Sequence, residues 1–115
     1  MSAADRQAIS DAMNTVAGIT CSPYYRQVTK AGEAMVRIDR TVYPDSLGGL
    51  ATWQVVVILP QDVVAAEKYL DEKTDALVAA AWTQMAVGSV TPSEIVLAEG
   101  QRLPCVLIEG VRETN

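Results

Sequence analysis

The sequence predicts an α+β fold in which a mostly antiparallel sheet of four to five strands packs with two helices, in the order α-β-β-β-α-β-β. Two segments repeat apolar residues at helical spacing. The other apolar segments are short, rich in β-branched residues and bounded by glycine or proline. The chain has 115 residues, 50% of them hydrophobic, so we expect residues 1–115 to form one domain with a sizeable core.

The first predicted element is a helix over residues 3–17. Ile9 and Met13 recur at helical spacing and lie on one face, and Gly18 then ends the pattern. We expect no secretory signal peptide here, because residues 1–11 contain acidic and polar residues in place of a cationic start followed by an apolar run.

Two strands are predicted next, over residues 24–29 and 33–43, joined as a hairpin by residues 30–32, which include a glycine. The second strand alternates apolar and polar side chains, so only one of its faces is expected in the core. Its apolar face consists of Ala34, Val36, Ile38 and Val42, and its polar face of Arg37, Asp39 and Thr41.

Residues 44–50 are predicted to form a loop because they are rich in turn residues, although Leu47 and Leu50 are unusual in a solvated loop. Residues 53–59 follow as a strand that is apolar on both faces, which places it at the centre of the sheet. Trp53 at its start is expected in the core, and Pro60 ends the strand.

A long second helix is predicted over residues 62–86, with Asp62 as its N-cap and Gly88 beyond its end. Its second half, residues 76–82, carries no charged side chain on any side. The stripe expected to face the core consists of Val63, Ala66, Leu70, Thr74, Leu77, Ala81 and Met85.

The last two predicted strands, residues 93–99 and 103–111, are joined by residues 100–102 and are apolar on both faces. Two helices, each about 10 Å across, cover at most one face of a sheet roughly 20 to 24 Å wide. We therefore expect one bare apolar face if both helices pack on the same side, or two half-bare faces if they pack on opposite sides. In either case we expect self-association that buries one sheet face together with the second half of the long helix. The helix residues expected in this subunit interface are Ala76, Ala79, Ala80 and Trp82.

Composition argues against several classes of function. The net charge of −5 has the wrong sign for a protein that mainly grips nucleic acid, and no apolar run approaches the roughly 20 residues of a membrane helix. The sequence has no histidine, the commonest general base and metal ligand, and we expect neither a cofactor nor a metal. Cys21 and Cys105 are expected to be small buried side chains; a disulfide between them requires that their backbones meet.

Two groups of polar and charged residues each allow a structural and a functional interpretation. The acids Glu67, Asp71, Glu72 and Asp75 are interpreted as a solvated helix face, in preference to an acid-base pair or a cation site. A basic and aromatic group can contact a nucleic acid backbone, but in an acidic protein we favour its pairing with the carboxylates of a neighbouring subunit. This group consists of Tyr24, Tyr25, Arg26, Lys30, Arg37 and Arg40.

A family resemblance rests on five segments taken together. They are residues 23–27 (Pro-Tyr-Tyr-Arg-Gln), 32–40, 53–60 (Trp-Gln-Val-Val-Val-Ile-Leu-Pro), the 62–81 helix with its Ala-Ala-Glu at 65–67, and 107–112 (Leu-Ile-Glu-Gly-Val-Arg). In this succession the chain resembles the small tail terminator, or tail completion, proteins of siphophages over nearly its whole length. The resemblance is one of pattern and includes no catalytic motif.

The resemblance implies a structural virion protein and no enzyme activity. Members of the family close into a ring, typically a hexamer, on the last ring of tail tube protein, stop tube growth and present the surface for head-tail joining. It implies assembly in the host cytoplasm, a position at the top of the tail, and three partners: further copies of the chain, the tail tube protein, and a head-tail connector or neck protein. Genomic DNA would pass through without specific binding, and no membrane is involved. Axial contacts are expected at Lys30, Leu47, Gly48, Gly49 and Leu50.

Alternative functions stay open at this point. Another neck component, such as a connector or a stopper, shares the expected pattern and differs in its partner. A cellular small-ligand-binding or regulatory α+β module would be a stable monomer with a closed apolar pocket and convergent polar groups. A carboxylate enzyme is the least favoured, because no pair of acids is forced together by spacing.

Overall fold

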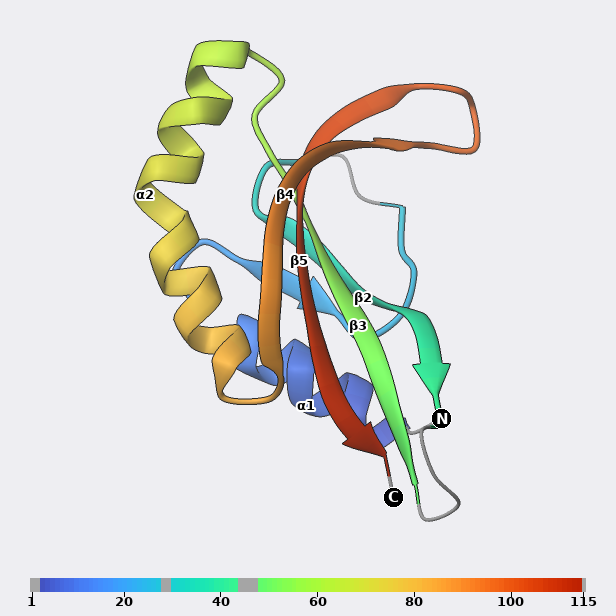
Figure 1. Ribbon diagram of the computed structural model, residues 1–115. Helices are drawn as coiled ribbons and strands as arrows, with labels where there is room; N and C mark the ends of the chain where they lie inside the picture. The colour runs from blue at the N-terminus through green and yellow to red at the C-terminus, as the bar shows by residue number, and fades with distance from the viewer. Residues whose placement is uncertain (1–2, 28–29, 44–47, 115) are drawn as a thin grey trace.

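The computed structural model describes residues 3–27, 30–43 and 48–114 of the protein (Figure 1). It contains two helices and one five-stranded sheet, which confirms the predicted α+β fold class and element order. Among the described residues, no helix has the length and apolar composition needed to span a bilayer. The elements are α1 (Ala3–Met13), β1 (Thr20–Ser22), β2 (Glu33–Val42), β3 (Gly49–Ile58), α2 (Val63–Trp82), β4 (Ala86–Val96) and β5 (Arg102–Thr114).

The strands lie in the order β1-β2-β3-β5-β4, and every neighbouring pair is antiparallel except β1 with β2. The predicted strand over residues 24–29 is wrong, because residues 23–27 are irregular and the strand in this region is the earlier, shorter β1. Residues 28 and 29 lie outside the described residues. The predicted tight hairpin at residues 30–32 is also wrong, because β1 and β2 are parallel. The chain must return to the end of the sheet at which β1 begins before β2 can start beside it.

Polar side chains at the C-terminal end of α1 and just beyond it explain where β1 forms and why the helix ends before residue 17. The Ser10 hydroxyl donates to the carbonyl of Cys21 at 3.0 Å, and the Cys21 amide donates to Asn14 Oδ1 at 2.7 Å. The Asn14 side chain is thus bonded to β1, and the helix ends one residue earlier, at Met13. Turns follow up to Gly18, whose φ is 81°. Only glycine adopts that conformation without strain.

Helix α2 begins as predicted, because the Asp62 carboxylate accepts a hydrogen bond from the Ala65 amide at 2.9 Å. It ends at Trp82, earlier than the predicted residue 86, since Ala86 already opens β4. Leu77 and Ala81 of the predicted core stripe are buried. Val63 was predicted on that stripe and is instead 73% exposed.

Strand β2 contains a bulge that reverses its pattern of faces. Ile38 lies opposite Trp53, but Arg40, two residues later, lies opposite Thr52, the immediate neighbour of Trp53. The extra residue between them moves every following side chain to the other face. Thr41 therefore points to the helix side and Val42 to the opposite side, so the predicted faces of these two residues are wrong.

Strands β3 and β4 are longer than predicted. Strand β3 begins at Gly49 and pairs with β5 along its whole length, so the predicted loop over residues 44–50 extends too far. Residues 44–47 lie outside the described residues. Strand β4 begins at Ala86 instead of residue 93 and contains Pro92, which is tolerated because β4 is an edge strand and needs hydrogen bonds on one side only.

Both helices pack on the same side of the sheet, as Figure 1 shows. The core between the layers combines Ile9 and Met13 of α1 with Leu77 of α2 and the inner side chains of the central strands. Trp53 is fully buried there, as its position in the sequence predicted. This arrangement leaves two outer surfaces: the side of α2 that faces solvent and the face of the sheet opposite the helices.

Candidate interaction surfaces

The four α2 residues expected in a subunit interface fall into two environments. Ala76 and Ala79 are exposed, and Trp82 presents 55% of its surface to solvent. Ala80 instead packs into the core, because it lies on the sheet-facing side of the helix. The exposed apolar residues at the C-terminal end of α2, Ala76, Ala79 and Trp82, are called the helix patch below.

The residues expected to make axial contacts lie at two opposite ends of the molecule. Gly48, Gly49 and Leu50 lead into β3, and Gly49 is buried as part of that strand. Lys30 lies just before the start of β2, about 30 Å away along a ten-residue strand. Leu47 lies outside the described residues. The structure thus does not bring Lys30 together with Leu50.

The sheet face opposite the helices is less bare than predicted. Met35, Val56, Ile58 and Cys105 lie on this face and are buried, with Ile95 and Leu107 packed against them. Figure 1 shows the reason: the far half of the β4–β5 hairpin bends away from α2, toward the other side of the sheet. The chain therefore covers one half of this face by itself, and the expectation of a fully bare face is wrong.

The other half of this face stays open and forms a second apolar surface. Val42 is 45% exposed, and Leu50 and Val111 are each 37% exposed. Val42 pairs with Leu50, and Val111 pairs with Thr52, so the three side chains are neighbours on one face. We call them the sheet patch. Sequence reasoning missed Val42 and Val111, because the bulge in β2 and the register of β5 decide their exposure.

A row of polar side chains crosses the three central strands between the two halves of this face. Arg37 Nε donates to Gln54 Oε1 at 2.6 Å, and Gln54 Nε2 donates to Glu109 Oε2 at 2.9 Å. Arg37 is exposed, whereas Gln54 and Glu109 are half-buried. The row thus contains one positive and one negative side chain, and the Arg37 guanidinium is the more exposed of the two.

The basic and aromatic group of the sequence is divided in the structure. Arg26 forms an ion pair with Glu33 at 3.8 Å, while Arg37 and Arg40 lie on the open sheet face. Tyr24 is held by Arg6, whose guanidinium lies 4.8 Å from its ring centroid and 5.2 Å from that of Trp53. No common basic surface for nucleic acid results from this placement.

The acidic residues of α2 lie on its solvent face. Glu67, Asp71, Glu72 and Asp75 are exposed, and within the described part of the chain none of them forms an ion pair. The described residues contain no group of three or more His, Cys, Asp or Glu side chains placed to hold a metal ion. These acids therefore contribute negative surface potential next to the helix patch.

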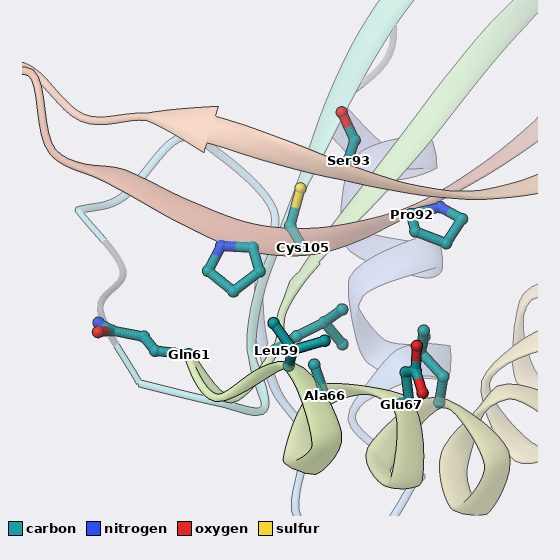
Figure 2. A pocket seen from close by; sticks show the side chains of 10 residues that line it. Leu59, Gln61, Ala66, Glu67, Pro92, Ser93 and Cys105 are labelled. Atoms are coloured by element: carbon teal, nitrogen blue, oxygen red, sulfur yellow. The ribbon is translucent and has the colours of Figure 1, made fainter.

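One pocket lies between the start of α2 and the β4–β5 hairpin (Figure 2). Its volume is about 310 Å³, and its walls are mainly apolar, with Leu59, Ala66 and Leu70 on one side and Pro92 and Pro104 on the other. The polar side chains in its lining are those of Gln61, Glu67 and Ser93. Its shape and lining fit an apolar group better than a charged substrate.

Neither cysteine offers a reactive thiol to this pocket. Figure 2 shows the Cys105 sulfur pointing away from Leu59 and Ala66. Burial raises the pKa of the Cys105 thiol, and the positive charge of Arg37 opposes that shift only in part. Burial also raises the pKa of Cys21 to about 11. Both thiols are buried and unpaired with each other, as expected for structural side chains.

Comparison with known proteins does not name a family. No protein-family model matches the chain, and no curated protein matches its sequence.

Proposed function

We propose that the chain is a structural virion protein of a phage with a long non-contractile tail, in which copies close into a ring, typically of six, on the tail tube. The ring stops tube polymerisation and presents the surface for head-tail joining. The proposal is supported by the siphophage tail terminator resemblance, which spans nearly the whole chain, and by the α+β fold with the predicted element order.

The observation that carries the proposal is the presence of two exposed apolar patches on opposite sides of the molecule. The helix patch faces away from the sheet, and the sheet patch lies on the face that the helices leave open. Exposed apolar area at two separate places is typical of a subunit that contacts two neighbours, because each neighbour removes one patch from water.

The proposed mechanism is steric. A ring with one face complementary to the tube and a different opposite face ends a polymer that would otherwise continue to elongate. The end of the molecule at Gly48 and Leu50 and the end at Lys30 are the two axial surfaces, one for the tube protein and one for the neck protein. A net charge of −5 per subunit suits a channel through which DNA passes without being held.

Electron microscopy of the purified protein tests the proposal directly. We expect negatively stained rings of uniform symmetry, and we expect the protein to bind tail tube protein in a pull-down. Binding to portal protein without binding to tube protein would point to a connector or stopper. A monomer at all concentrations that binds neither partner would contradict the proposal.

The pocket supports a second candidate, a small-ligand-binding α+β module. Its apolar walls and volume of about 310 Å³ are within the range of ligand sites. A stable monomer whose thermal unfolding temperature rises with a small apolar ligand would favour this function over the ring.

A further inference from the structure

We propose that copies of this chain associate head to tail, with the helix patch and its flanking acids on one copy against the sheet patch and its flanking arginines on the next. This inference rests on the ring of the proposed function and names the two surfaces that would form it. The occupant of each patch is a second copy of the chain.

The helix side of the contact is a single stripe along α2. Asp71, Asp75, Ala79 and Trp82 follow one another at intervals of three or four residues, so they lie on the same side of the helix. All four are exposed, and this side is opposite the buried residues Leu77 and Ala81. The stripe begins with negative charge and ends with apolar surface.

The sheet side has the same order with the opposite charge. Along β2, the exposed Arg37 and Arg40 precede Val42, and all three lie on the face opposite the helices. Leu50 and Val111 extend the apolar end across β3 and β5. This face also carries two acids, Glu109, which accepts a hydrogen bond from Gln54, and Glu113, which lies opposite Leu50; both belong to β5 and are separated by β3 from the arginines on β2.

The two stripes also agree in length and direction. Eleven helical steps from Asp71 to Trp82 cover about 17 Å. Five strand steps from Arg37 to Val42 also cover about 17 Å. In Figure 1 the C-terminal end of α2 and the end of β2 lie at the same lower end of the molecule. A neighbour placed beside the molecule therefore matches acids with arginines and apolar patch with apolar patch.

The contact is heterologous, because two different surfaces of the chain meet. Such contacts give a closed ring when the rotation between copies divides a full turn, and an open filament otherwise. An isologous dimer would instead bring together two copies of the same patch, so neither the acids nor the arginines would meet an opposite charge, which disfavours it.

Charge reversal with rescue tests this contact. Asp71→Lys with Asp75→Lys, and separately Arg37→Glu with Arg40→Glu, should each raise the concentration needed for assembly by about 10- to 100-fold in light scattering. The variant with all four substitutions should assemble like the wild type, because the opposite charges are again matched. Asp11→Lys with Glu99→Lys changes the net charge by the same amount and sign as the Asp71 and Asp75 pair, at exposed sites outside both patches, and should leave assembly unchanged.

The outcomes separate this inference from the proposed function. Circular dichroism first establishes that each variant is folded. If both charge-reversed variants form rings as readily as the wild type, the head-to-tail contact is overturned and the proposed ring is not. The same holds if the wild type forms rings and the variant with all four substitutions remains dissociated. A wild type that never assembles and does not bind tube protein would overturn the proposed function and this contact together.

Discussion

At the scale of single residues, Gly110 shows how close packing fixes a position in the sheet. Gly110 lies opposite Trp53 in β3, on the face toward the helices, and Met85 packs over it. A Cβ at this position would lie 2.7 Å from Met85 Cγ and 2.9 Å from the backbone oxygen of Ala86. The methionine can shift, but the backbone at the start of β4 cannot do so without cost.

We expect Gly110→Ala to lower the free energy of unfolding by about 1 to 3 kcal/mol, the range for an overpacked core site. Gly88→Ala is the matched control, since the nearest atom to a Cβ there is Glu109 O at 4.0 Å. Urea unfolding of both variants measures the difference. Equal stabilities would contradict the tight contact with Met85.

A second prediction at this scale concerns Cys21 and the dependence of stability on pH. Burial raises the thiol pKa from 9.0 to about 11, so between these values the unfolded chain loses the proton and the folded chain keeps it. The free energy of unfolding should therefore be unaffected by this group below pH 8 and fall by about 2 kcal/mol as the pH rises from 9 to 11.

The measurement is urea unfolding at a series of pH values, with Cys21→Ala as the control. Tyr69 and Cys105 also have pKa values raised by burial, so the variant should keep a smaller alkaline loss. An unchanged slope between pH 9 and 11 in Cys21→Ala would show that the Cys21 thiol does not cause the effect.

At the scale of elements, Arg112 joins three parts of the fold. Its Nε lies 3.1 Å from Asp5 Oδ1 of α1, and its guanidinium donates to both the backbone and side-chain oxygens of Gln84 at 2.9 Å. The side chains of Arg112 and Asp5 are 28% and 16% exposed. The position of α1 on the sheet thus depends partly on an arginine from the last strand.

Arg112→Ala should lower the free energy of unfolding by about 1 to 3 kcal/mol, because half-buried acceptors lose a charged donor. Arg102→Ala is a suitable comparison: Arg102 pairs with Glu94 at 3.9 Å, and both side chains are largely exposed. That substitution should cost less than about 1 kcal/mol. Thermal unfolding of the two variants side by side distinguishes them, and equal losses would show that Arg112 does not anchor α1.

Local signals predicted the elements better than their pairing. The Asp62 cap, the buried Trp53 and the apolar strand around it were predictable because each depends on the residue and its immediate neighbours. The parallel β1 and the bulge in β2 were not, because they depend on contacts with α1 and with β3, which lie beyond the immediate sequence neighbours. The misplaced Val42 follows directly from the unpredicted bulge.

At the scale of the whole molecule, exposed apolar surface was predicted over a whole sheet face, and the structure exposes only half of that face. Counting helix widths against the width of the sheet ignored the bending of the β4–β5 hairpin, which covers Val56 and Ile58. The surface that remains is smaller and consists of side chains near the ends of strands. On α2 the uncharged second half correctly indicated exposed apolar residues, although Ala80 faces the core.

Trp82→Ala makes the last prediction, at the scale of the assembly. Trp82 is 55% exposed at the end of α2, so its removal should change the stability of the monomer by less than about 1 kcal/mol. In an interface, a tryptophan that becomes buried typically contributes 2 kcal/mol or more, so assembly should weaken by about 30-fold.

Val64→Ala is the control for Trp82→Ala, because Val64 is 58% exposed at the other end of the same helix, away from the helix patch. Sedimentation velocity over a range of concentrations measures both variants. If Trp82→Ala assembles as readily as Val64→Ala, the exposed end of α2 is not a contact between subunits.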